Sequence, residues 1–462
     1  MSNHFSDPHC ELPAICAIIK LKHKEDSDAG RKDESMHALT ELIRNDMKPA
    51  LGVTEPAAIA FAVAAARQHA KGAIKRVTVR LNSGMYKNAF TCGIPGSDQV
   101  GNLHAAALGA VGADPSKGLE CLEGITKAQN IAAQALVEEG KVRVEMSQIT
   151  SRIRIDAEVS AENGSAVVMI RDGHTNIVTI KENDTIVFET EDPVPDDDVS
   201  GVQESSPIHL YSMEQLYRYA ATVPLEEIAF IRDAYDMNLA LFYEGQESGK
   251  TVFGPYLLAA NGGKVLGPDE QKTASLLCCG AIEARVLGLS RPAMSITGSG
   301  AHGIIATLPL YAAYKVRGYT EEALLRATAL SYLVCMFIKE YSGKLSAFCG
   351  CAIAAGTGMA CGIVFLRGGS VEQMAGAINN MAGSITGMIC DGGNQGCTMK
   401  GVVAVDAAYQ SVNMAMAGVS IAGIHGIAAT TPEEAMRNMG LVASPGMEET
   451  EKTILEILKR SL

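Results

Sequence analysis

The chain has 462 residues, of which 47% are hydrophobic and 20% are charged, so we expect it to fold around a large core. Its formal net charge of −13, without any long run of Lys and Arg, argues against a nucleic-acid-binding protein. Tryptophan is absent and glycine occurs 46 times, so small side chains must fill much of the core. The amino terminus lacks the pattern of a signal peptide, and we therefore expect a cytoplasmic protein that does not enter a membrane.

The first segments of the chain differ sharply in character. Residues 1–36 include a mixed-charge run without an apolar period, which predicts a flexible extension. The patterns that follow predict two helices, a strand and two more helices. These segments cover residues 36–51, 57–70, 76–82, about 101–112 and about 118–139. Thr54 is the predicted N-cap of the second helix, with Pro56 just inside it.

In the middle of the chain, apolar and polar residues alternate with a period of two. Residues 141–190 alternate in this way between Gly- and Asn-rich breaks, which predicts an antiparallel meander. Residues 191–207 carry six acids, three prolines and no base, which indicates a linker. The pattern over residues 208–462 is almost entirely helical. The sequence therefore predicts an α+β fold, with an amino-terminal α/β domain containing an antiparallel sheet (37–190) and an all-helical domain (208–462).

Five of the twelve cysteines lie in a charge-poor region near the carboxyl end, at Cys349, Cys351, Cys361, Cys390 and Cys397. Clustered thiols in a cytoplasmic protein suggest metal or redox chemistry, and thiolates are the usual ligands of iron–sulfur clusters. Three such ligands would leave one iron open to a substrate, as in catalytic metal sites. The spacing is no general metal signature, however, and buried cysteines also pack as small apolar side chains.

The segments around these cysteines resemble a known family. The run Gly387–Gly392, followed by Cys397, Met399 and Lys400, is similar to the cluster loop of the iron–sulfur L-serine dehydratase alpha-chain and L-cysteine desulfidase family, as is Leu345–Cys349. Further similar segments occur in the same order at residues 48–52 with 54–56, at 173–178, and at 298–300 with 303–304. The resemblance extends from about residue 40 to the end of the chain, and is nearest to the bacterial cysteine desulfidase branch.

This resemblance implies a 4Fe-4S cluster held by the carboxy-terminal domain. It places the three ligands on Cys349, Cys390 and Cys397. Cys351 stands two residues from the first of these positions and is its rival, whereas Cys361 is expected to pack inside a helix.

One position departs from the family pattern. In the turn before Thr54, the desulfidases have a cysteine that is taken to transfer a proton, but this chain has Val53. Valine can neither carry a proton nor attack a substrate. Either another group takes the proton, or the substrate differs from cysteine, or the chain is a non-catalytic relative.

His174, His302 and Glu55 are the candidate catalytic residues. The reference pKa of histidine suits proton transfer near pH 7, but His174 could equally be a turn residue bonded to the backbone. His302 follows a glycine-rich loop, and its alternative is a surface position. Glu55 lies near Val53, the position that differs from the family pattern, although an acidic residue there also suits the start of a helix.

A second set of residues is expected to bind the carboxylate of a substrate. The glycine- and hydroxyl-rich segment 295–303 precedes a helix, and such a loop can present N–H groups to an anion. The expected binding residues are Thr54, Lys87, Asn88, Thr175, Asn176, Ser299 and Gly300. The alternatives are that Thr175 and Asn176 only cap their turn, and that Lys87 is solvated.

The resemblance implies a lyase that needs no pyridoxal phosphate and eliminates the β-substituent of a small serine- or cysteine-like amino acid. The products would be a 2-oxo acid and ammonia, in amino-acid degradation. The expected partner is this small substrate, with no nucleic acid or membrane, and the chain can form a homo-oligomer. Two other hypotheses are a diverged relative that binds a cluster or a small carboxylate without catalysis, and a small-molecule binding module without a cluster.

Overall fold

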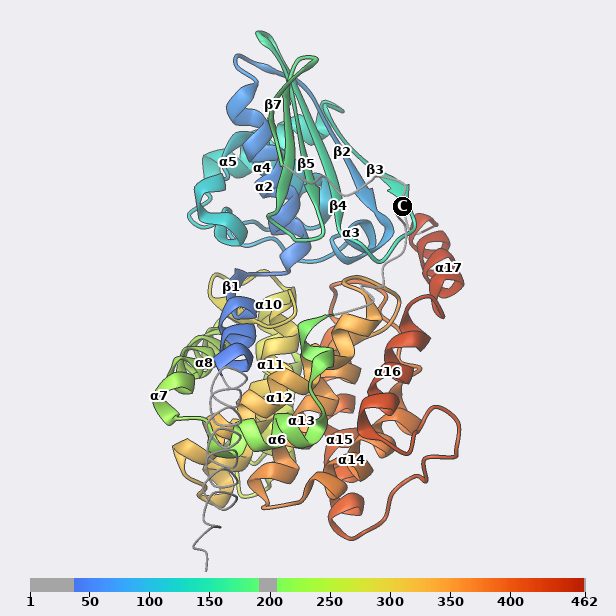
Figure 1. The fold of residues 1–462 in the computed structure, drawn as a ribbon. Coiled ribbons are helices and arrows are strands. Elements are labelled where there is room, and N and C mark those ends of the chain that lie inside the picture. The colour runs from blue at the N-terminus through green and yellow to red at the C-terminus, as the bar shows by residue number, and fades with distance from the viewer. Residues whose placement is uncertain (1–36, 191–205, 461–462) are drawn as a thin grey trace, which may run out of the picture.

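A computed structural model describes residues 37–190 and 206–460 of the chain. The expectations for residues 1–36 and for most of the linker lie outside these residues. Figure 1 shows two parts, a sheet with helices packed against it and a larger assembly of helices. The predicted α+β fold is confirmed. No helix in the two described ranges is long and apolar enough to cross a membrane.

The six-stranded sheet of the amino-terminal part has the order β3-β2-β4-β5-β6-β7. Its strands are β2 (Ile74–Asn82), β3 (Val142–Gln148), β4 (Arg154–Ala161), β5 (Gly164–Arg171), β6 (Ile177–Glu182) and β7 (Thr185–Glu189). Strands β4 to β7 form the predicted antiparallel meander, but β3 pairs in parallel with β2. The prediction of one continuous meander was therefore wrong at its first strand. The helices between β2 and β3 supply the long crossover that a parallel pair needs.

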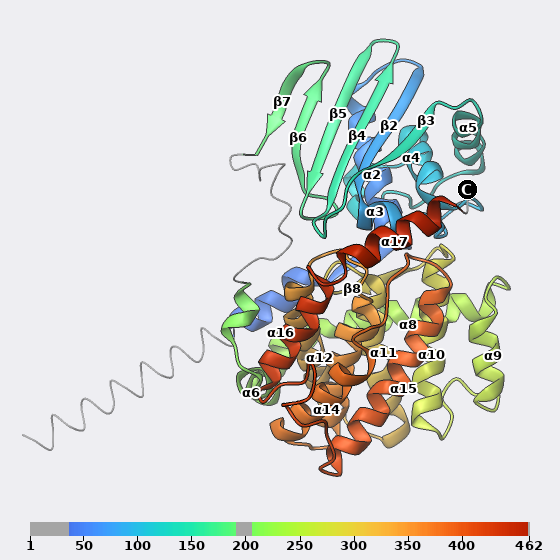
Figure 2. The same ribbon diagram turned by 90° about the vertical axis from the view of Figure 1, so that its right-hand side faces the viewer.

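One face of this sheet is covered by α2 (Thr54–His69) and α4 (Gly101–Val111), and α5 (Lys127–Glu138) packs against α4, as Figure 2 shows. Side chains along β4 are alternately buried and half-buried, as expected for a sheet with one covered face. Helix α2 begins at Thr54, and Val53 occupies the N-cap position, so the predicted Thr54 cap was wrong by one residue. The predicted helix over 118–139 is interrupted, because the Thr126 capping box starts α5 only at Lys127.

The carboxy-terminal part is built around long buried helices. Its central helices are α10 (Glu270–Val286), α11 (Gly300–Arg317), α12 (Glu321–Ser342), α13 (Gly356–Leu366) and α15 (Gly396–Met416). The surrounding helices are α6 (Met213–Thr222), α7 (Leu225–Ile228), α8 (Arg232–Glu247), α9 (Phe253–Ala260), α14 (Val371–Ile385), α16 (Pro432–Ala443) and α17 (Glu448–Lys459). Short helical turns are α3 (Ser83–Asn88), η1 (Pro115–Glu120), η2 (Pro207–Leu210), η3 (Ala229–Ile231) and the π-helix η4 (Cys351–Ala355).

A short two-stranded sheet connects the beginning of the described chain to the helical part. Strand β1 (Lys48–Leu51) pairs antiparallel with β8 (Pro292–Ser295). The helix predicted over residues 36–51 therefore ends at residue 46, because Pro49 cannot continue it. Leu39 and Ile43 of that helix are buried in the core of the helical part. Residues 37–51 thus pack with the second half of the chain.

Candidate functional site

A cavity of about 290 Å³ lies where the two parts meet. Of the residues expected at the site, those that line it are Glu55, Asn88, His174, Thr175, Ser299, His302 and Cys390. The expected residues that do not line it are Thr54, Lys87, Asn176, Gly300, Cys349 and Cys397. A larger hollow of about 850 Å³, between α5 and the loop after α10, contains none of them. The smaller cavity is therefore the candidate site.

Glu55 enters this cavity from the first turn of α2. Its two carboxylate oxygens are held by different donors: Asn88 Nδ2 donates to Oε1 at 2.8 Å, and the Thr54 hydroxyl donates to Oε2 at 3.0 Å. Burial opposes ionisation, but the facing His174, the Asn88 amide and Arg285 outweigh it and hold the pKa of Glu55 below its usual value. Glu55 is therefore a fixed negative charge in the cavity wall.

His174 faces Glu55 from the turn between β5 and β6. Its Nε2 atom is buried and has no hydrogen-bond partner. Burial lowers the pKa of His174, while the charge on Glu55 raises it, and burial outweighs that charge. Near pH 7 the ring is therefore a neutral imidazole with a free nitrogen, beside a carboxylate that would stabilise it once protonated.

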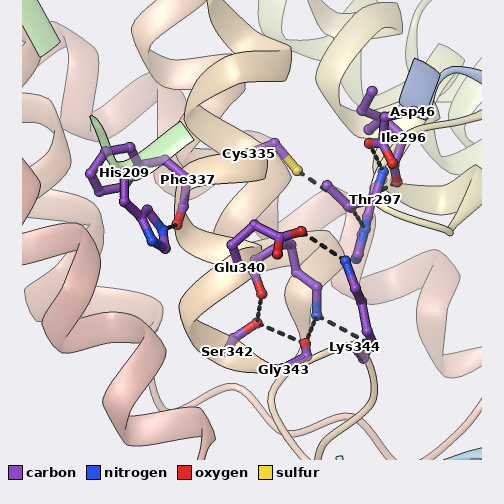
Figure 3. Close-up of polar contacts among 12 residues, drawn as sticks. Asp46, His209, Ile296, Thr297, Cys335, Phe337, Glu340, Ser342, Gly343 and Lys344 are labelled. Atoms are coloured by element: carbon purple, nitrogen blue, oxygen red, sulfur yellow. Dashed lines mark hydrogen bonds and ion pairs between the residues drawn. The ribbon is translucent and has the colours of Figure 1, made fainter. Parts of the chain in front are cut away.

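The loop before α11 forms the opposite wall. Thr297 and Gly298 both have positive φ angles, of 52° and 76°, and this turns the chain sharply from β8 into the helix. The His174 ring lies over Gly298, since a methyl group added there would be 3.4 Å from the ring Cε1. Figure 3 shows Asp46 beside Thr297, whose backbone N–H donates to the Asp46 carboxylate. The loop is therefore tied to residues 37–51.

His302 lies in the first turn of α11 and is 5% exposed, which excludes a surface position. Its Nδ1 atom contacts the Thr297 hydroxyl, and that hydroxyl donates to the Ile296 carbonyl. The hydroxyl therefore accepts a hydrogen bond from Nδ1–H, and Nε2 keeps its lone pair. Burial, helped by the charge on Lys339, lowers the pKa of His302 to about 3. His302 is thus a much weaker base than a histidine of ordinary pKa.

Two backbone segments bring the cysteines together. Phe348 and Ile389 form an isolated antiparallel bridge, the Cys349 N–H donates to Met388 O at 3.0 Å, and the Cys390 N–H donates to Ala347 O at 2.6 Å. These hydrogen bonds therefore hold residues 347–349 and 388–390 side by side, although about forty residues separate them in the sequence.

The third cysteine, Cys397, stands in the first turn of α15. The Gly392–Gly393 turn before that helix is tightly packed. A methyl group would lie 2.7 Å from Lys87 O if added to Gly392, and 2.9 Å from Val53 Cγ1 if added to Gly393. Val53 therefore packs directly against the loop that carries Cys390 and Cys397.

Cys349, Cys390 and Cys397 lie close enough to affect one another electrostatically. The hydrogen bond with Cys351, and then burial, raise the pKa of the Cys349 thiol. Burial raises the pKa of the Cys390 and Cys397 thiols, and the nearby Cys349 raises both further. Among residues 37–190 and 206–460, however, no three His, Cys, Asp or Glu side chains gather tightly enough to hold a single metal ion. A four-iron cluster is larger than one ion and takes thiolate ligands that stand farther apart. The donor chemistry thus fits a cluster, and the side chains do not form a compact ion site.

Cys351 remains a rival for the first ligand position. Its side chain hydrogen-bonds the thiol of Cys349, and it lines the cavity whereas Cys349 does not. Cys361 is fully buried in α13, as expected for a packing residue.

Lys87 and Asn176 are engaged elsewhere in the structure. Lys87 is buried, pairs with Glu451 of α17 at 2.8 Å, and donates to the carbonyls of Cys390 and Ser346. It is therefore not solvated, and it holds the cysteine segments against α17. Asn176 Nδ2 donates to Arg171 O at 3.0 Å, so this side chain caps its own turn.

Sequence reasoning missed several charged residues around the site, among them Asp46, Lys339 and Arg285, while Asp172 and Lys344 also line the cavity. Asp46 and Lys339 line the cavity, and Lys339 is buried while it donates to Gly343 O at 2.9 Å. Arg285 is buried behind the Ser299 loop. The available signal was a lone basic residue in an otherwise apolar helix, in SYLVCMFIKEYS for Lys339 and in SLLCCGAIEARV for Arg285.

Comparison with known proteins agrees with this architecture. Residues 116–456 match the family model described as serine dehydratase alpha chain. The chain belongs to the serine dehydratase alpha-chain family. The family resemblance seen in the sequence is thereby confirmed. Both cysteine segments, His174 and the Ser299 loop lie inside the matched region, while Glu55 lies before it.

Similar full-length proteins occur in several bacteria. A UPF0597 protein of Clostridium botulinum (strain Okra) is 40% identical over 425 residues, covering 92% of this chain and 98% of the relative. UPF0597 proteins of Oleidesulfovibrio alaskensis and Caldanaerobacter subterraneus are 36% and 34% identical, and cover 90% and 93% of this chain and 96% and 99% of their own length. Membership of the serine dehydratase alpha-chain family fits a lyase of amino-acid degradation, while the names of these relatives state no activity.

Proposed function

We propose that the chain is a lyase that eliminates the β-hydroxyl or β-thiol group of a small amino acid and yields a 2-oxo acid and ammonia. The observation that carries this proposal is the cavity itself. It joins Glu55 and His174 from the amino-terminal part to the Ser299 loop and Cys390 from the helical part. The candidate base His174, the Glu55 carboxylate, the glycine- and hydroxyl-rich Ser299 loop and the Cys390 thiol thus surround one space of small-molecule size.

Cys349, Cys390 and Cys397 would hold a 4Fe-4S cluster at the thiol end of the cavity. When bound, a cluster with three protein ligands supplies an open iron that acts as a Lewis acid toward the leaving group. Lys87 contributes by fixing the carbonyls of Cys390 and Ser346, which keeps the two cysteine segments in register.

His174 would remove the α-proton of the substrate through its unpartnered Nε2. The negative charge of Glu55 stabilises the imidazolium that forms, and Asn88 and Thr54 keep that carboxylate in place. We prefer His174 to His302 because the low pKa of His302 makes it a poor proton acceptor.

The electron balance of the reaction follows from this proton removal. The Cα–H electron pair forms the Cα–Cβ double bond, and the Cβ–O or Cβ–S bond breaks with its electrons on the leaving atom. The leaving hydroxide or hydrosulfide takes up the proton that His174 removed and departs as water or hydrogen sulfide, and the enamine tautomerises to an imine. Water hydrolyses the imine to the 2-oxo acid and ammonia, so the sum is neither an oxidation nor a reduction.

The second candidate function is binding of a cluster or small carboxylate without turnover. Val53 favours it, because this side chain packs against the Cys390–Cys397 loop at the position where the desulfidases have a proton-transferring cysteine. If this hypothesis holds, the protein binds iron but releases no ammonia.

Anaerobic purification followed by product assays tests both candidates. We expect about four irons per chain for a cubane cluster, and equal amounts of ammonia and 2-oxo acid from L-serine or L-cysteine. Cys349→Ser, Cys390→Ser and Cys397→Ser should each lose most of the iron, while Cys361→Ser keeps it as the matched control. Iron-loaded protein that forms neither product from either amino acid would overturn the lyase proposal. Loss of iron in Cys351→Ser but not in Cys349→Ser would move the first ligand to Cys351.

A further inference from the structure

Arg285 is a buried positive charge without a partner. It lies in the last turn of α10 and is 4% exposed, and its Nε atom is buried without a hydrogen bond. Across residues 37–190 and 206–460, no carboxylate forms an ion pair with its guanidinium, although Glu55 is near enough to respond to its charge. A buried charge without a partner is costly to keep, so its retention calls for a ligand.

The guanidinium lies against the amino-terminal end of α11. A methyl group added to Gly300 would be only 2.6 Å from Arg285 Nε. The N-cap residue Ser299 forms no side-chain cap, so the first-turn N–H groups of this 18-residue helix are not satisfied in that way. The positive end of the helix dipole and the arginine therefore converge on one place.

This place lies behind the cavity wall, because Gly298, Ser299 and His302 line the cavity whereas Arg285 and Gly300 do not. The charge of Arg285 also acts on Glu55, His174 and His302, which surround the same space. An anion in the cavity against Gly298 and Ser299 would thus lie between the charge of Arg285 behind this loop and His174, whose ring lies over Gly298.

We propose that Arg285 and the amino-terminal end of α11 form the subsite that binds the α-carboxylate of the amino-acid substrate. This assignment rests on the proposed function, because it takes the carboxylate to be that of the lyase substrate. A carboxylate here would neutralise Arg285 and leave the α-carbon facing His174.

L-Alanine is a suitable probe, because it has the carboxylate and amine of a substrate but no β-leaving group. Calorimetric titration of the anaerobically purified protein should show binding of L-alanine and at least tenfold weaker binding of L-alaninamide. Arg285→Met should weaken L-alanine binding by about 10-fold, because it removes a buried positive charge behind the bound carboxylate. The melting temperature of ligand-free Arg285→Met should not fall, since the substitution removes an unpaired buried charge.

Gly300→Ala provides a second variant that displaces the guanidinium without removing it, and it should also weaken L-alanine binding. Gly356→Ala is the matched control, because its added methyl group meets the flexible end of Met381 at 3.3 Å and Ala404 Cβ at 3.5 Å, which is ordinary packing distance. Wild-type affinity in Arg285→Met, or equal binding of L-alanine and L-alaninamide, would overturn the subsite even if serine or cysteine is turned over. Arginine-dependent binding without any turnover would support the subsite and refute the lyase.

Discussion

His174 and Glu55 come from segments more than one hundred residues apart, yet the charge on each shifts the pKa of the other. The two residues therefore form a proton-accepting pair, in which Glu55 is already fixed by Asn88 and Thr54. No local pattern in the sequence reveals this pairing, because it depends on where the β5–β6 turn meets the start of α2. The types of residue could be predicted from the sequence, but their relation could not.

Replacing His174 tests the assigned base directly. His174→Asn should lower the rate of ammonia release by about 10²–10⁴-fold, the typical worth of a positioned acid–base group. The iron content should stay at the wild-type level, because His174 is not among the proposed ligands. Wild-type turnover in this variant, with turnover lost in His302→Asn, would transfer the role to His302.

The pH profile provides an independent test of the pair. Activity requires neutral His174, so it should be complete at neutral pH and be lost as the pH falls through the pKa of His174, which burial places below its usual value. The charge on Glu55 raises that pKa, so Glu55→Gln should move the acidic limb to lower pH as well as slow the reaction. A limb that stays in place in Glu55→Gln would contradict the coupling.

Substitution of Val53 tests whether L-cysteine is a substrate of this protein. It is 2% exposed and packs against the Gly393 backbone, so a cysteine fits the same space. Val53→Cys should raise the release of hydrogen sulfide from L-cysteine by up to about 10²-fold, if that position carries a proton in the desulfidases. Val53→Ala controls for the change in volume. A wild type that already converts L-cysteine rapidly, with no gain in Val53→Cys, would show that the position is not needed.

At the scale of elements, short segments decide how the site is assembled. The period of two predicted the strands, but it could not show that β3 joins β2 in parallel, because a strand pattern does not name its partner. The residues of strand β1 were predicted to be helical, because the sequence pattern does not show their pairing with β8, which lies more than two hundred residues away. These long-range pairings place Asp46 and the Thr297 loop beside the cavity.

The ion pair between Lys87 in α3 and Glu451 in α17 joins the amino-terminal part to the last helix that the structure describes. Both side chains are buried, so removing one partner leaves the other charge uncompensated. Lys87→Met should lower the free energy of unfolding by about 3–5 kcal/mol in denaturant titrations, and Lys87→Met with Glu451→Leu should recover part of that loss. Lys452→Met, which breaks an exposed pair on the same helix, should leave stability unchanged. Equal effects of the buried and exposed changes would contradict this role.

At the scale of the whole molecule, the cavity belongs to neither part alone. Its walls come from the β5–β6 turn and α2 on one side, and from the β8–α11 loop and the cysteine segments on the other. Residues 37–51 pack with the helical part and lead directly into α2, so the two parts are connected through the site itself. A ligand in this cavity must therefore restrain both parts at once.

Hydrogen–deuterium exchange measures that restraint. Saturating L-alanine should slow amide exchange in residues 172–176 and in residues 296–302, because each segment contributes side chains to the same small cavity. Strand β7, whose residues are all exposed at the sheet edge, should exchange at the same rate with and without ligand and serves as the internal control. Protection confined to residues 296–302 would mean that the carboxylate binds without engaging His174. Protection of both segments that disappears in Arg285→Met would show that the arginine is needed to hold the ligand between the two parts.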